Sequence, residues 1–547
     1  MAGPVERDRA ALSPNALPRW LVPAIAALPI VVLGGLYFWP LATLLTRVVR
    51  PSSLGDALGI PGLANVLWFT LWQALVSTIL TLAIGFIPAY VLARYRFVGR
   101  RALLAIVTVP FMLPTVVVGA AFLALLPTER HGTARAVILA HVFFNIAVVV
   151  RLVGAMWAVL PTDLTAAART LGASPAQVLR HVVLPLLRPS LWAAATVVFL
   201  FTFTSFGAVR LLGGSGNPTL EVEIVRRATQ LGDVDGAAVL SLLQLLALAA
   251  VVWWSTRSRR RGTHALSGSS HWRVARSRRE RSAVLATAAA IAIVMSLPLA
   301  VMASRSFRLG DQWTLTAWRK LGNAEVRPGV SLGVDPIASL LTSLRFAAVA
   351  AIMSVVVGGL AALAIAAARR RGALLDVGLM LPLGTSAVTV GLGLLITFDT
   401  APLDWRSRWW LVPLGHALVA IPFVVRAVLP VLRAIPSDQR SAAATLGASP
   451  TRAWLAIDLQ RVLRPLVAAS GLAAAISLGE FGATTLLTRA GNETMPIAIA
   501  RLLGRTGELP RAQAFALATM LMVVTAVIIV GVIGAAEREG VFDARSR

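Results

Sequence analysis

The chain of 547 residues is 57% apolar, only 14% charged and strongly basic, with a net charge of +27 at pH 7 and a mean hydropathy of +0.78. Soluble domains carry charge on about a quarter of their residues, so this composition excludes a soluble protein and predicts an integral membrane protein. The absence of cysteine excludes disulfides, iron–sulfur clusters and a thiol nucleophile. The six histidines follow no ligand spacing, so no metal site is expected.

The distribution of the basic residues indicates what they do. Arginines lie in short clusters between apolar runs rather than on one basic face, which predicts membrane topology signals and no nucleic-acid partner. The only lysine, Lys320, follows Arg319. A phosphate-binding P-loop requires Gly-Lys followed by Ser or Thr, so the chain is not expected to bind ATP in this way by itself.

Apolar runs of about 20 residues predict twelve membrane spans. The first apolar run is too long for a signal peptide and follows a polar segment, residues 1–18, so we expect a retained membrane anchor. The predicted spans lie near residues 20–45, 66–92, 102–126, 135–160, 190–213, 236–256, 283–303, 338–367, 373–397, 408–434, 464–488 and 512–535.

A basic linker separates the first six predicted spans from the last six. Residues 257–281 contain nine arginines and one acid, Glu280, which predicts a cytoplasmic location by the positive-inside rule. Both termini are then cytoplasmic, and the polar segment 304–337 is external. The expected domains are a first six-span repeat over 1–256, a cytoplasmic linker over 257–282 and a second six-span repeat over 283–547.

One sequence segment occurs twice, 275 residues apart. Residues 171–175 and 446–450 both read Leu-Gly-Ala-Ser-Pro, and the same lag relates His141 to His416. The lag also relates Phe206-Gly207-Ala208 to Phe481-Gly482-Ala483, whereas Arg188-Pro189 and Arg464-Pro465 are 276 apart, which implies one inserted residue. The chain is therefore predicted to be a duplicated unit, and the even number of spans makes it a parallel repeat.

Each copy of the segment predicts a first short helix. Residues 161–163 and 436–438 read Pro, Thr or Ser, then Asp, which places a hydroxyl at the helix N-cap and a carboxylate beside the positive end of the helix dipole. An alanine-rich stretch continues the helix. Gly172 and Gly447 are expected to end it in the left-handed conformation.

A second helix is predicted directly after the turn. Ser174-Pro175 and Ser449-Pro450 provide a capping residue and a proline at the first helical position, and Ser174 with Gln177 fits a capping box. One apolar stripe on this helix suits packing beneath the membrane spans. The small-residue turn would then protrude toward a partner protein.

This pattern resembles the cytoplasmic loop motif of the permease subunits of ABC importers that use a solute-binding protein. That motif reads Glu-Ala-Ala, then a Gly, and ends in Leu-Pro, here Leu184-Pro185. The chain departs from it at Ala166 and Ser441, where Glu is expected, and at Gln460, where Pro is expected. The resemblance implies that the loops dock on ATP-binding subunits through Leu171, Gly172, Ala173 and Ser174 and through Leu446, Gly447, Ala448 and Ser449.

The fusion of two permeases in one chain is most similar to ferric-iron and thiamine permeases, and residues 203–214 and 219–223 are similar to thiamine permeases. The resemblance implies an all-α type I importer permease with two parallel six-helix repeats in a bacterial cell membrane. Implied partners are two ATP-binding subunits that carry ATP and magnesium, an extracytoplasmic solute-binding protein, a small-molecule substrate and membrane lipid. The chain itself is expected to bind no cofactor and to catalyse no reaction.

A carboxylate lies well inside a predicted span at Glu480. An ionisable group at that depth is costly and functional by default, although it could instead cap the backbone or pair with an arginine at a broken helix. Glu480 and Phe481 with their repeat mates Ser205 and Phe206 form the predicted translocation path. Both Phe-Gly-Ala turns are expected to kink their spans there.

Other residues in the spans have simpler interpretations. Phenylalanines at 199, 201, 203 and 206 could stack on a flat cationic ring, although packing in the core or against lipid is commoner for this residue. Arg151 and Arg426 are expected to extend toward the cytoplasmic surface. His141 and His416 are expected to make hydrogen bonds between helices.

The sequence leaves two classes of transporter open. The first is the permease of an ATP-driven importer for thiamine or ferric iron, or for an oxyanion such as sulfate or molybdate, because those permeases share a segment similar to residues 479–483. The second is an ion-coupled secondary transporter with two parallel halves. That transporter would need several buried acids or histidines, whereas this chain offers Glu480, and it would leave the duplicated loop unexplained.

Overall fold

The computed structural model describes residues 21–48, 59–259, 272–275, 277–322, 325–327, 330–331, 335–368, 372–399 and 403–544. The polar segment 1–18, much of the predicted linker (260–271 and 276) and parts of the predicted external segment (323–324, 328–329 and 332–334) lie outside the described residues. The described chain forms two compact units by contact. We call Leu45–Leu340 with Glu493–Val523 the first-repeat unit, and Met1–Leu44, Leu341–Asn492 and Val524–Arg547 the second-repeat unit.

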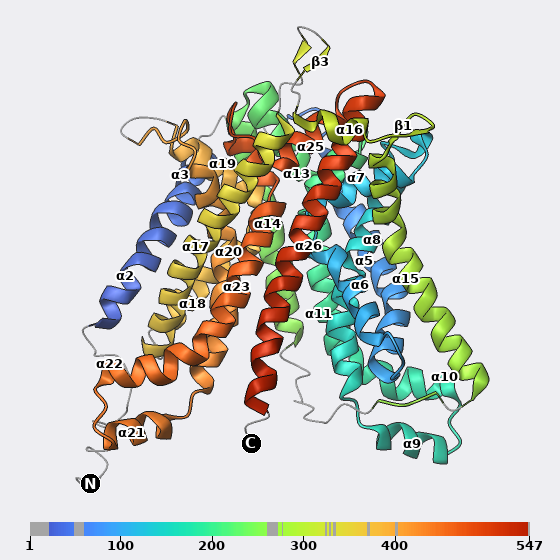
Figure 1. The fold of residues 1–547 in the computed structure, drawn as a ribbon, viewed down its shortest axis with the longest axis vertical. Helices are drawn as coiled ribbons and strands as arrows, with labels where there is room; N and C mark the ends of the chain where they lie inside the picture. The colour runs from blue at the N-terminus through green and yellow to red at the C-terminus, as the bar shows by residue number, and fades with distance from the viewer. Residues whose placement is uncertain are drawn as a thin grey trace. The chain divides into compact units, whose positions relative to one another are not determined.

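The first-repeat unit is built mainly of long helices (Figure 1). Its elements are α5 (Leu63–Arg94), α6 (Arg100–Met112), α7 (Thr115–Leu125), η2 (Thr128–Arg130), α8 (Ala134–Ala158), α9 (Thr162–Thr170), α10 (Pro175–Val178), η3 (Leu179–Val183), α11 (Leu184–Phe203), α12 (Gly207–Leu212), α13 (Leu220–Arg226), η4 (Arg227–Leu231), α14 (Val234–Arg259), α15 (Arg278–Ser306), β1 (Arg308–Leu309), β2 (Gln312–Trp313), α16 (Thr316–Arg319), η5 (Lys320–Gly322), β3 (Glu325–Arg327), β4 (Val330–Ser331), α25 (Met495–Leu503) and the start of α26 (Glu508–Ala544). The strands form two antiparallel pairs, β1 with β2 and β3 with β4.

The second-repeat unit repeats much of this series. Its elements are α2 (Leu21–Leu33), η1 (Gly34–Phe38), most of α3 (Trp39–Val48), most of α17 (Pro336–Ala368), α18 (Gly372–Met380), η6 (Leu381–Gly384), α19 (Ala387–Thr397), α20 (Leu411–Ala434), α21 (Ser437–Thr445), α22 (Pro450–Ala453), η7 (Trp454–Leu459), α23 (Gln460–Gly479), α24 (Gly482–Leu487) and the rest of α26.

The structure confirms an all-α membrane protein. Over the described residues, ten helices are long and apolar enough to cross a membrane, and two bent pairs of helices raise the number to as many as twelve. The bent pairs are α6 with α7, at 105°, and α18–η6 with α19, at 101°. They occupy the predicted spans near 102–126 and 373–397, so those two spans are broken rather than continuous.

The break between α6 and α7 has a local cause. Leu113 is extended (ψ 149°) and Pro114 is the N-cap of α7. Proline cannot donate a backbone hydrogen bond and disfavours the helical conformation of the residue before it. In the second-repeat unit, Ser386 starts α19 instead, and its hydroxyl accepts hydrogen bonds from the backbone N–H groups of Val388 and Thr389 at 3.1 and 3.4 Å. Both breaks therefore begin at a residue that favours a helix start.

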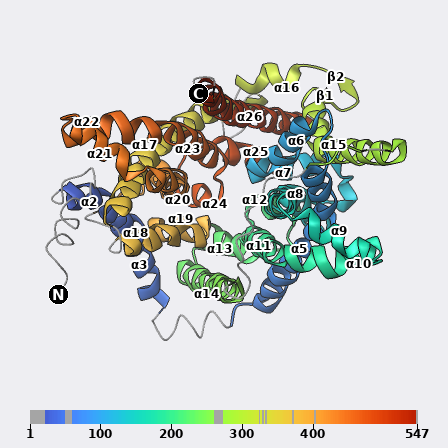
Figure 2. The same cartoon turned by 90° about the horizontal axis from the view of Figure 1, so that it is seen from below.

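Each unit packs around a glycine contact. A Cβ atom at Gly85 on α5 would lie 2.9 Å from Cβ of Val149 on α8, and one at Gly358 on α17 would lie 2.8 Å from Cβ of Val424 on α20. Both valines are buried and are 275 residues apart. Only glycine permits these approaches, because an added side chain would overlap the valine. Figure 2 shows α5, α8 and α11 side by side in the first-repeat unit, where they contact one another.

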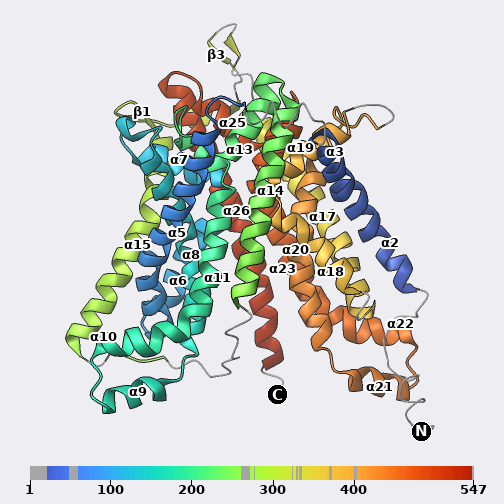
Figure 3. The same cartoon turned by 180° about the vertical axis from the view of Figure 1, so that it is seen from behind.

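The compact units divide the chain differently from the sequence repeats. The first predicted span, α2 to α3, packs in the second-repeat unit, where the Tyr37 hydroxyl lies 2.6 Å from that of Thr385. The first span after the linker, α15, packs against α5, α6 and α7 of the first-repeat unit (Figure 3). The predicted boundaries 1–256 and 283–547 describe the duplication in sequence, whereas the packing exchanges the first span of each half.

Both predicted fifth spans differ from expectation in their limits. Each begins earlier, because the helix after the Leu-Gly-Ala-Ser-Pro turn continues into the span over Pro175–Phe203 and Thr451–Gly479. The predicted kinks are confirmed, since α11 ends at Phe203 before α12 begins at Gly207, and α23 ends at Gly479 before α24 begins at Gly482. The second helix of the motif is therefore the start of a span, not a separate helix.

A π-helical segment explains the drift in the repeat lag. The segment η3 has five residues and η7 has six; their starts, Leu179 and Trp454, are 275 apart and their ends, Val183 and Leu459, are 276 apart. A π-helix accommodates an added residue within a helix. The implied insertion is thus located in η7.

Candidate functional site

The two duplicated turns have the same backbone conformation. Gly172 and Gly447 have φ angles of +83° and +79°. In the first turn the N–H of Ala173 donates to the carbonyl of Ala168 at 3.0 Å and that of Gly172 to the carbonyl of Arg169 at 2.9 Å; the second turn has both equivalents at 3.0 Å. This is the Schellman motif, which requires a residue that tolerates positive φ. The predicted helix-ending glycines are confirmed.

The caps on either side of the turns are partly as predicted. The Ser174 N–H donates to Oε1 of Gln177 at 2.8 Å and the Gln177 N–H donates to the Ser174 hydroxyl at 3.3 Å, which confirms the capping box. The first helix is different: its N-cap is Pro161 or Pro436, so Thr162 and Ser437 are its first helical residues rather than its N-cap. The prediction of a hydroxyl N-cap was wrong, because the proline before it already starts the helix with a suitable backbone conformation.

An exposed leucine stands at the tip of each turn. Leu171 and Leu446 are both 88% exposed, and a Cβ atom on Gly172 or Gly447 would meet nothing within 4 Å in the described chain. Figures 1 and 3 show α9 and α21 at the ends of their respective units, beyond the long helices. Single exposed apolar residues are common, but the same residue at the same open turn in both repeats suits insertion into a partner surface. The docking role of residues 171–174 and 446–449 stays a prediction.

The second turn has a support that the first lacks. On α21, the Arg440 guanidinium pairs with the carboxylate of Asp458 on η7, with Nε 3.1 Å from Oδ2 and a second bond from Nη2 to Oδ1. Asp458 is 1% exposed. At the corresponding positions the first repeat has Thr165 and Val183. Our sequence reasoning missed this pair, although the loss of both charges together in the other copy was a readable signal.

The predicted translocation-path residues are buried in their own units. Ser205 and Phe206 lie at the break between α11 and α12, and Glu480 and Phe481 at the break between α23 and α24. The Glu480 carboxylate accepts hydrogen bonds from the N–H groups of Ala483 and Thr484, at 3.1 and 2.9 Å, and from the Thr484 hydroxyl at 2.8 Å. Glu480 thus caps the start of α24, as the structural alternative supposed, and a role in the path stays a prediction.

His416 completes the polar cluster around Glu480. Its Nδ1 lies 2.7 Å from the Ser477 hydroxyl and its Nε2 lies 2.8 Å from the Thr484 hydroxyl and 3.6 Å from Oε2 of Glu480. The expected interhelical hydrogen bonds are confirmed for this residue. Its repeat mate His141 lies 3.5 Å from Ser77, and His141 Nε2 has no hydrogen-bond partner among the described residues.

Replacing Glu480 with alanine should lower the stability of the protein by about 2 kcal/mol, because it removes the acceptor for two backbone N–H groups and the charge beside the start of α24. Glu480→Gln keeps one acceptor oxygen and should lose about half as much. Thermal unfolding in detergent measures both. If both variants kept wild-type stability but lost substrate uptake, Glu480 would be a path residue rather than a cap.

The remaining residues singled out from the sequence have defined neighbours. Phe199 and Phe203 stack on each other, with ring centroids 5.5 Å apart. Phe201 makes an edge contact with Phe111 at 5.4 Å. Arg426 does not merely extend to the surface, because its Nη2 lies 3.2 Å from Oδ1 of Asp376 on α18.

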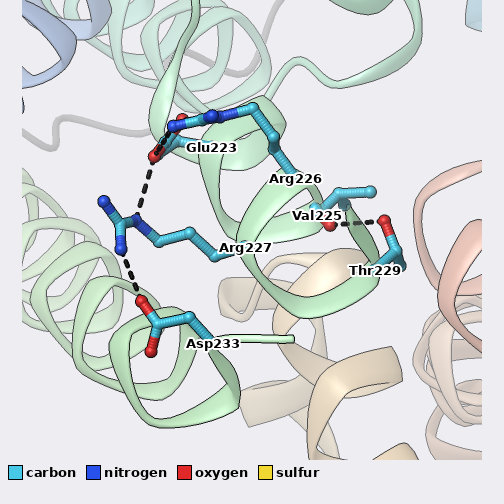
Figure 4. Close-up of polar contacts among 6 residues, drawn as sticks. All are labelled: Glu223, Val225, Arg226, Arg227, Thr229 and Asp233. Atoms are coloured by element: carbon cyan, nitrogen blue, oxygen red, sulfur yellow. Dashed lines mark hydrogen bonds and ion pairs between the residues drawn. The ribbon is translucent and has the colours of Figure 1, made fainter. Parts of the chain in front are cut away.

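A charge network that was not predicted from the sequence joins the end of α13 to η4 and the start of α14 (Figure 4), with Glu223 and Arg227 buried at its centre. Arg226 donates to both oxygens of Glu223, at 2.7 and 2.8 Å, and Nε of Arg227 donates to Oε1 at 2.9 Å. Arg227 also donates to Asp233, before α14, at 2.5 Å. Hydrogen bonding to Glu223 raises the pKa of the Arg226 guanidinium.

On the same helix Glu221 accepts from Gln244 of α14 at 2.7 Å. These contacts fasten α13 to α14, and the alternation of Glu221 and Glu223 with apolar residues was their sequence signal.

Comparison with known proteins places these features in a family. The profile described as "Binding-protein-dependent transport system inner membrane component" matches residues 81–261, which include the first turn. The thiamine transport system permease protein ThiP of Salmonella typhimurium is 25% identical over 520 residues, covering 89% of this chain and 92% of that protein. This match over nearly both lengths confirms the resemblance to a fused two-repeat permease.

Two further relatives are matched over less than half of this chain. The sulfate transport system permease protein CysT of Salmonella typhimurium is 30% identical, over 39% of this chain and 82% of its own length. The putative 2-aminoethylphosphonate transport system permease protein PhnV of Salmonella paratyphi A is 31% identical, over 37% of this chain and 76% of its own length. All these relatives are transport permeases. With its multiple apolar spans and duplicated turn, the chain belongs to the family of binding-protein-dependent transport system inner membrane components.

Proposed function

We propose that the chain is the permease subunit of an ATP-driven importer and that its substrate is thiamine. The observation that carries the proposal is the pair of identical turns, each ended by a glycine at positive φ and tipped by an exposed leucine. The similarity to ThiP over nearly the whole chain favours thiamine over sulfate and 2-aminoethylphosphonate, whose permeases match less than half of it. Ferric iron has no support among these relatives.

In this proposal the chain performs no bond chemistry. Two separate ATP-binding subunits hold ATP and magnesium, and each receives one turn: residues 171–174 in one subunit and 446–449 in the other. An extracytoplasmic solute-binding protein delivers the substrate at the opposite ends of the spans. Both termini would lie in the cytoplasm of a bacterial cell, because twelve spans put them on the same side as the arginine-rich linker, which the positive-inside rule makes cytoplasmic.

The proposed movement follows the helices that leave the turns. A displacement of α9 or α21 is transmitted to the span that follows, because each turn continues into one long helix, Pro175–Phe203 or Thr451–Gly479. In the second repeat the Arg440–Asp458 pair couples α21 directly to that helix. The far ends of both helices are the breaks at Ser205 and Glu480. Bending there would open or close the path in response to ATP.

The test is ATP hydrolysis and uptake in proteoliposomes that contain the chain, its ATP-binding subunit and its solute-binding protein. Thiamine, ferric ion, sulfate and 2-aminoethylphosphonate are supplied separately. Stimulation of hydrolysis and uptake by thiamine alone is the expected result. Stimulation by sulfate alone would keep the importer but replace the substrate. Uptake driven by an ion gradient without ATP would instead establish the secondary transporter.

A further inference from the structure

A cavity of about 250 Å³ lies in the second-repeat unit. It is formed by α17, by α20 and by η7 with the start of α23. Its wall is almost wholly apolar, with one charged member. The lining residues are Val355, Val356, Gly359, Leu360, Leu363, Leu432, Trp454, Asp458, Leu459, Val462 and Leu466.

The first repeat fills the same space with its own aromatic side chains. The equivalent contacts of Gly85 with Val149 and of Gly358 with Val424 align α5 with α17 at a lag of 273 residues. Phe86 and Tyr90 then correspond to Gly359 and Leu363, and Trp157 corresponds to Leu432 at the general lag of 275. In the first-repeat unit Trp157 packs against Phe86 and Tyr90, with ring centroids 4.7 and 5.0 Å away. The second repeat replaces all three rings with glycine and leucine.

The cavity is therefore a specific difference between two related folds rather than a general looseness of packing. Native interiors leave few voids, and an engineered apolar cavity of about 150 Å³ is large enough to bind benzene. This cavity is larger. Asp458 does not make it polar, because the carboxylate is engaged by Arg440. A water cluster would find few partners on such a wall, so the wall favours an apolar occupant.

The surroundings indicate which apolar occupant fits. Val356 lines the cavity and is 47% exposed, so the cavity opens to the surface of a helix that is long and apolar enough to span a membrane. Arg433 follows the lining residue Leu432, and Arg461 precedes the lining residue Val462; both are exposed and form no ion pair within the described residues. We infer that the cavity holds one acyl chain of an anionic phospholipid whose phosphate lies near these two arginines.

The site adjoins the support of the second turn. Trp454 and Asp458 belong to η7, and Asp458 holds Arg440 of α21. A chain in the cavity would pack against the face of η7 that carries this ion pair. At the equivalent positions of the first repeat, the rings of Phe86, Tyr90 and Trp157 occupy the cavity, and Thr165 and Val183 replace the ion pair. A lipid requirement would therefore act on the second turn.

The test uses the purified full-length chain in phosphatidylcholine nanodiscs that contain a phosphatidylglycerol probe with a photoreactive diazirine near the end of one acyl chain. After illumination, labelled peptides are located by mass spectrometry. We expect labelling concentrated on residues 355–363 and 454–466. The double variant Gly359→Phe with Leu432→Trp introduces two of the aromatic rings that the first repeat has at these positions. This labelling should be lost in the double variant. A Cβ at Gly359 would meet only Leu466 Cδ2, at 3.5 Å, so the added ring has room.

The matched control is Gly35→Phe, which adds the same ring to a span glycine whose Cβ would meet nothing within 4 Å of the described chain. It should keep wild-type labelling. If the double variant unfolds, as judged by its melting temperature, Leu432→Trp alone carries the test. Wild-type labelling no stronger on these segments than on α2, or unchanged labelling in a folded filled variant, would overturn the site. Equal labelling by a phosphatidylcholine probe would overturn its preference for an anionic headgroup.

Discussion

Replacing Leu171 and Leu446 together with aspartate should abolish the stimulated ATP hydrolysis of the reconstituted transporter while leaving the permease folded. Both leucines are 88% exposed, so each substitution should change stability by less than about 0.5 kcal/mol. A central apolar anchor of an interface contributes about 2 kcal/mol or more, which is roughly thirtyfold in affinity for each turn. Copurification of the ATP-binding subunit measures the association, and phosphate release measures the hydrolysis.

The control for this experiment is Val98→Asp. Val98 is 97% exposed and lies in the loop between α5 and α6. The arginines at 94, 96, 100 and 101 predict that this loop is cytoplasmic, as the turns are proposed to be. The substitution adds the same charge to that side of the protein without changing a turn, so association with the ATP-binding subunit and ATP hydrolysis should be unchanged. The single variants Leu171→Asp and Leu446→Asp should each give intermediate losses. Full hydrolysis in the double variant would refute docking through the turns.

The second large effect is expected at the ion pair behind the second turn. Asp458→Asn removes the charge from a buried site and leaves the Arg440 guanidinium without its counter-ion. The free energy of unfolding should fall by about 3 kcal/mol. The loss should be local, because α21 is held to η7 by this pair. Hydrogen exchange of the backbone of residues 437–445 should therefore accelerate, while exchange in α9 of the first repeat stays at its wild-type rate.

The first repeat supplies the control for this variant. Arg440→Thr combined with Asp458→Val replaces the ion pair with the residues that the first repeat has at these positions, Thr165 and Val183. Replacing both members of a buried ion pair with residues that pack well is often neutral, since neither charge is left unpaired. The double variant should thus recover most of the protection that Asp458→Asn loses. A double variant as unprotected as the single one would show that the pair is not what holds α21.

Much of the fold could be predicted because a membrane span requires a run of about 20 mainly apolar residues, which can be found directly in the sequence. The apolar runs located the ten long helices and the two bent pairs, although both fifth spans begin earlier than predicted. Gly172 and Gly447 were predictable because few other residues end a helix at positive φ. The breaks at Pro114 and Ser386 were not predicted. Proline inside an apolar run is compatible with both a kinked and a broken span, and the choice between them depends on neighbouring helices.

The buried charge pairs escaped prediction for a different reason. Arg440 and Asp458 are 18 residues apart, and Arg227 reaches Asp233 across the end of η4. Their pairing depends on how short helices fold back, which hydrophobic periodicity does not specify. Glu480 was recognised as unusual because of its depth, yet its bonds to Ala483 and Thr484 follow from the position of the helix break, which the sequence located only as a kink.

The six-residue η7 bears on how the two halves have diverged. An extra residue in an ordinary α-helix would rotate everything after it by about 100° and turn its lipid-facing side inward. Here α11 and α23 keep equal lengths of 20 residues, with both ends 276 apart, and the lag returns to 275 at α12 and α24 because the break before α24 is one residue shorter. Relative to α11, the helix α23 is therefore shifted by one residue number. The shift begins in the π-helical segment η7 and ends at the break before α24. The residue added in the π-helical turn η7 is thus balanced by the residue missing at the break before α24. Such a paired change is the kind that would leave the lipid-facing side of the span in place.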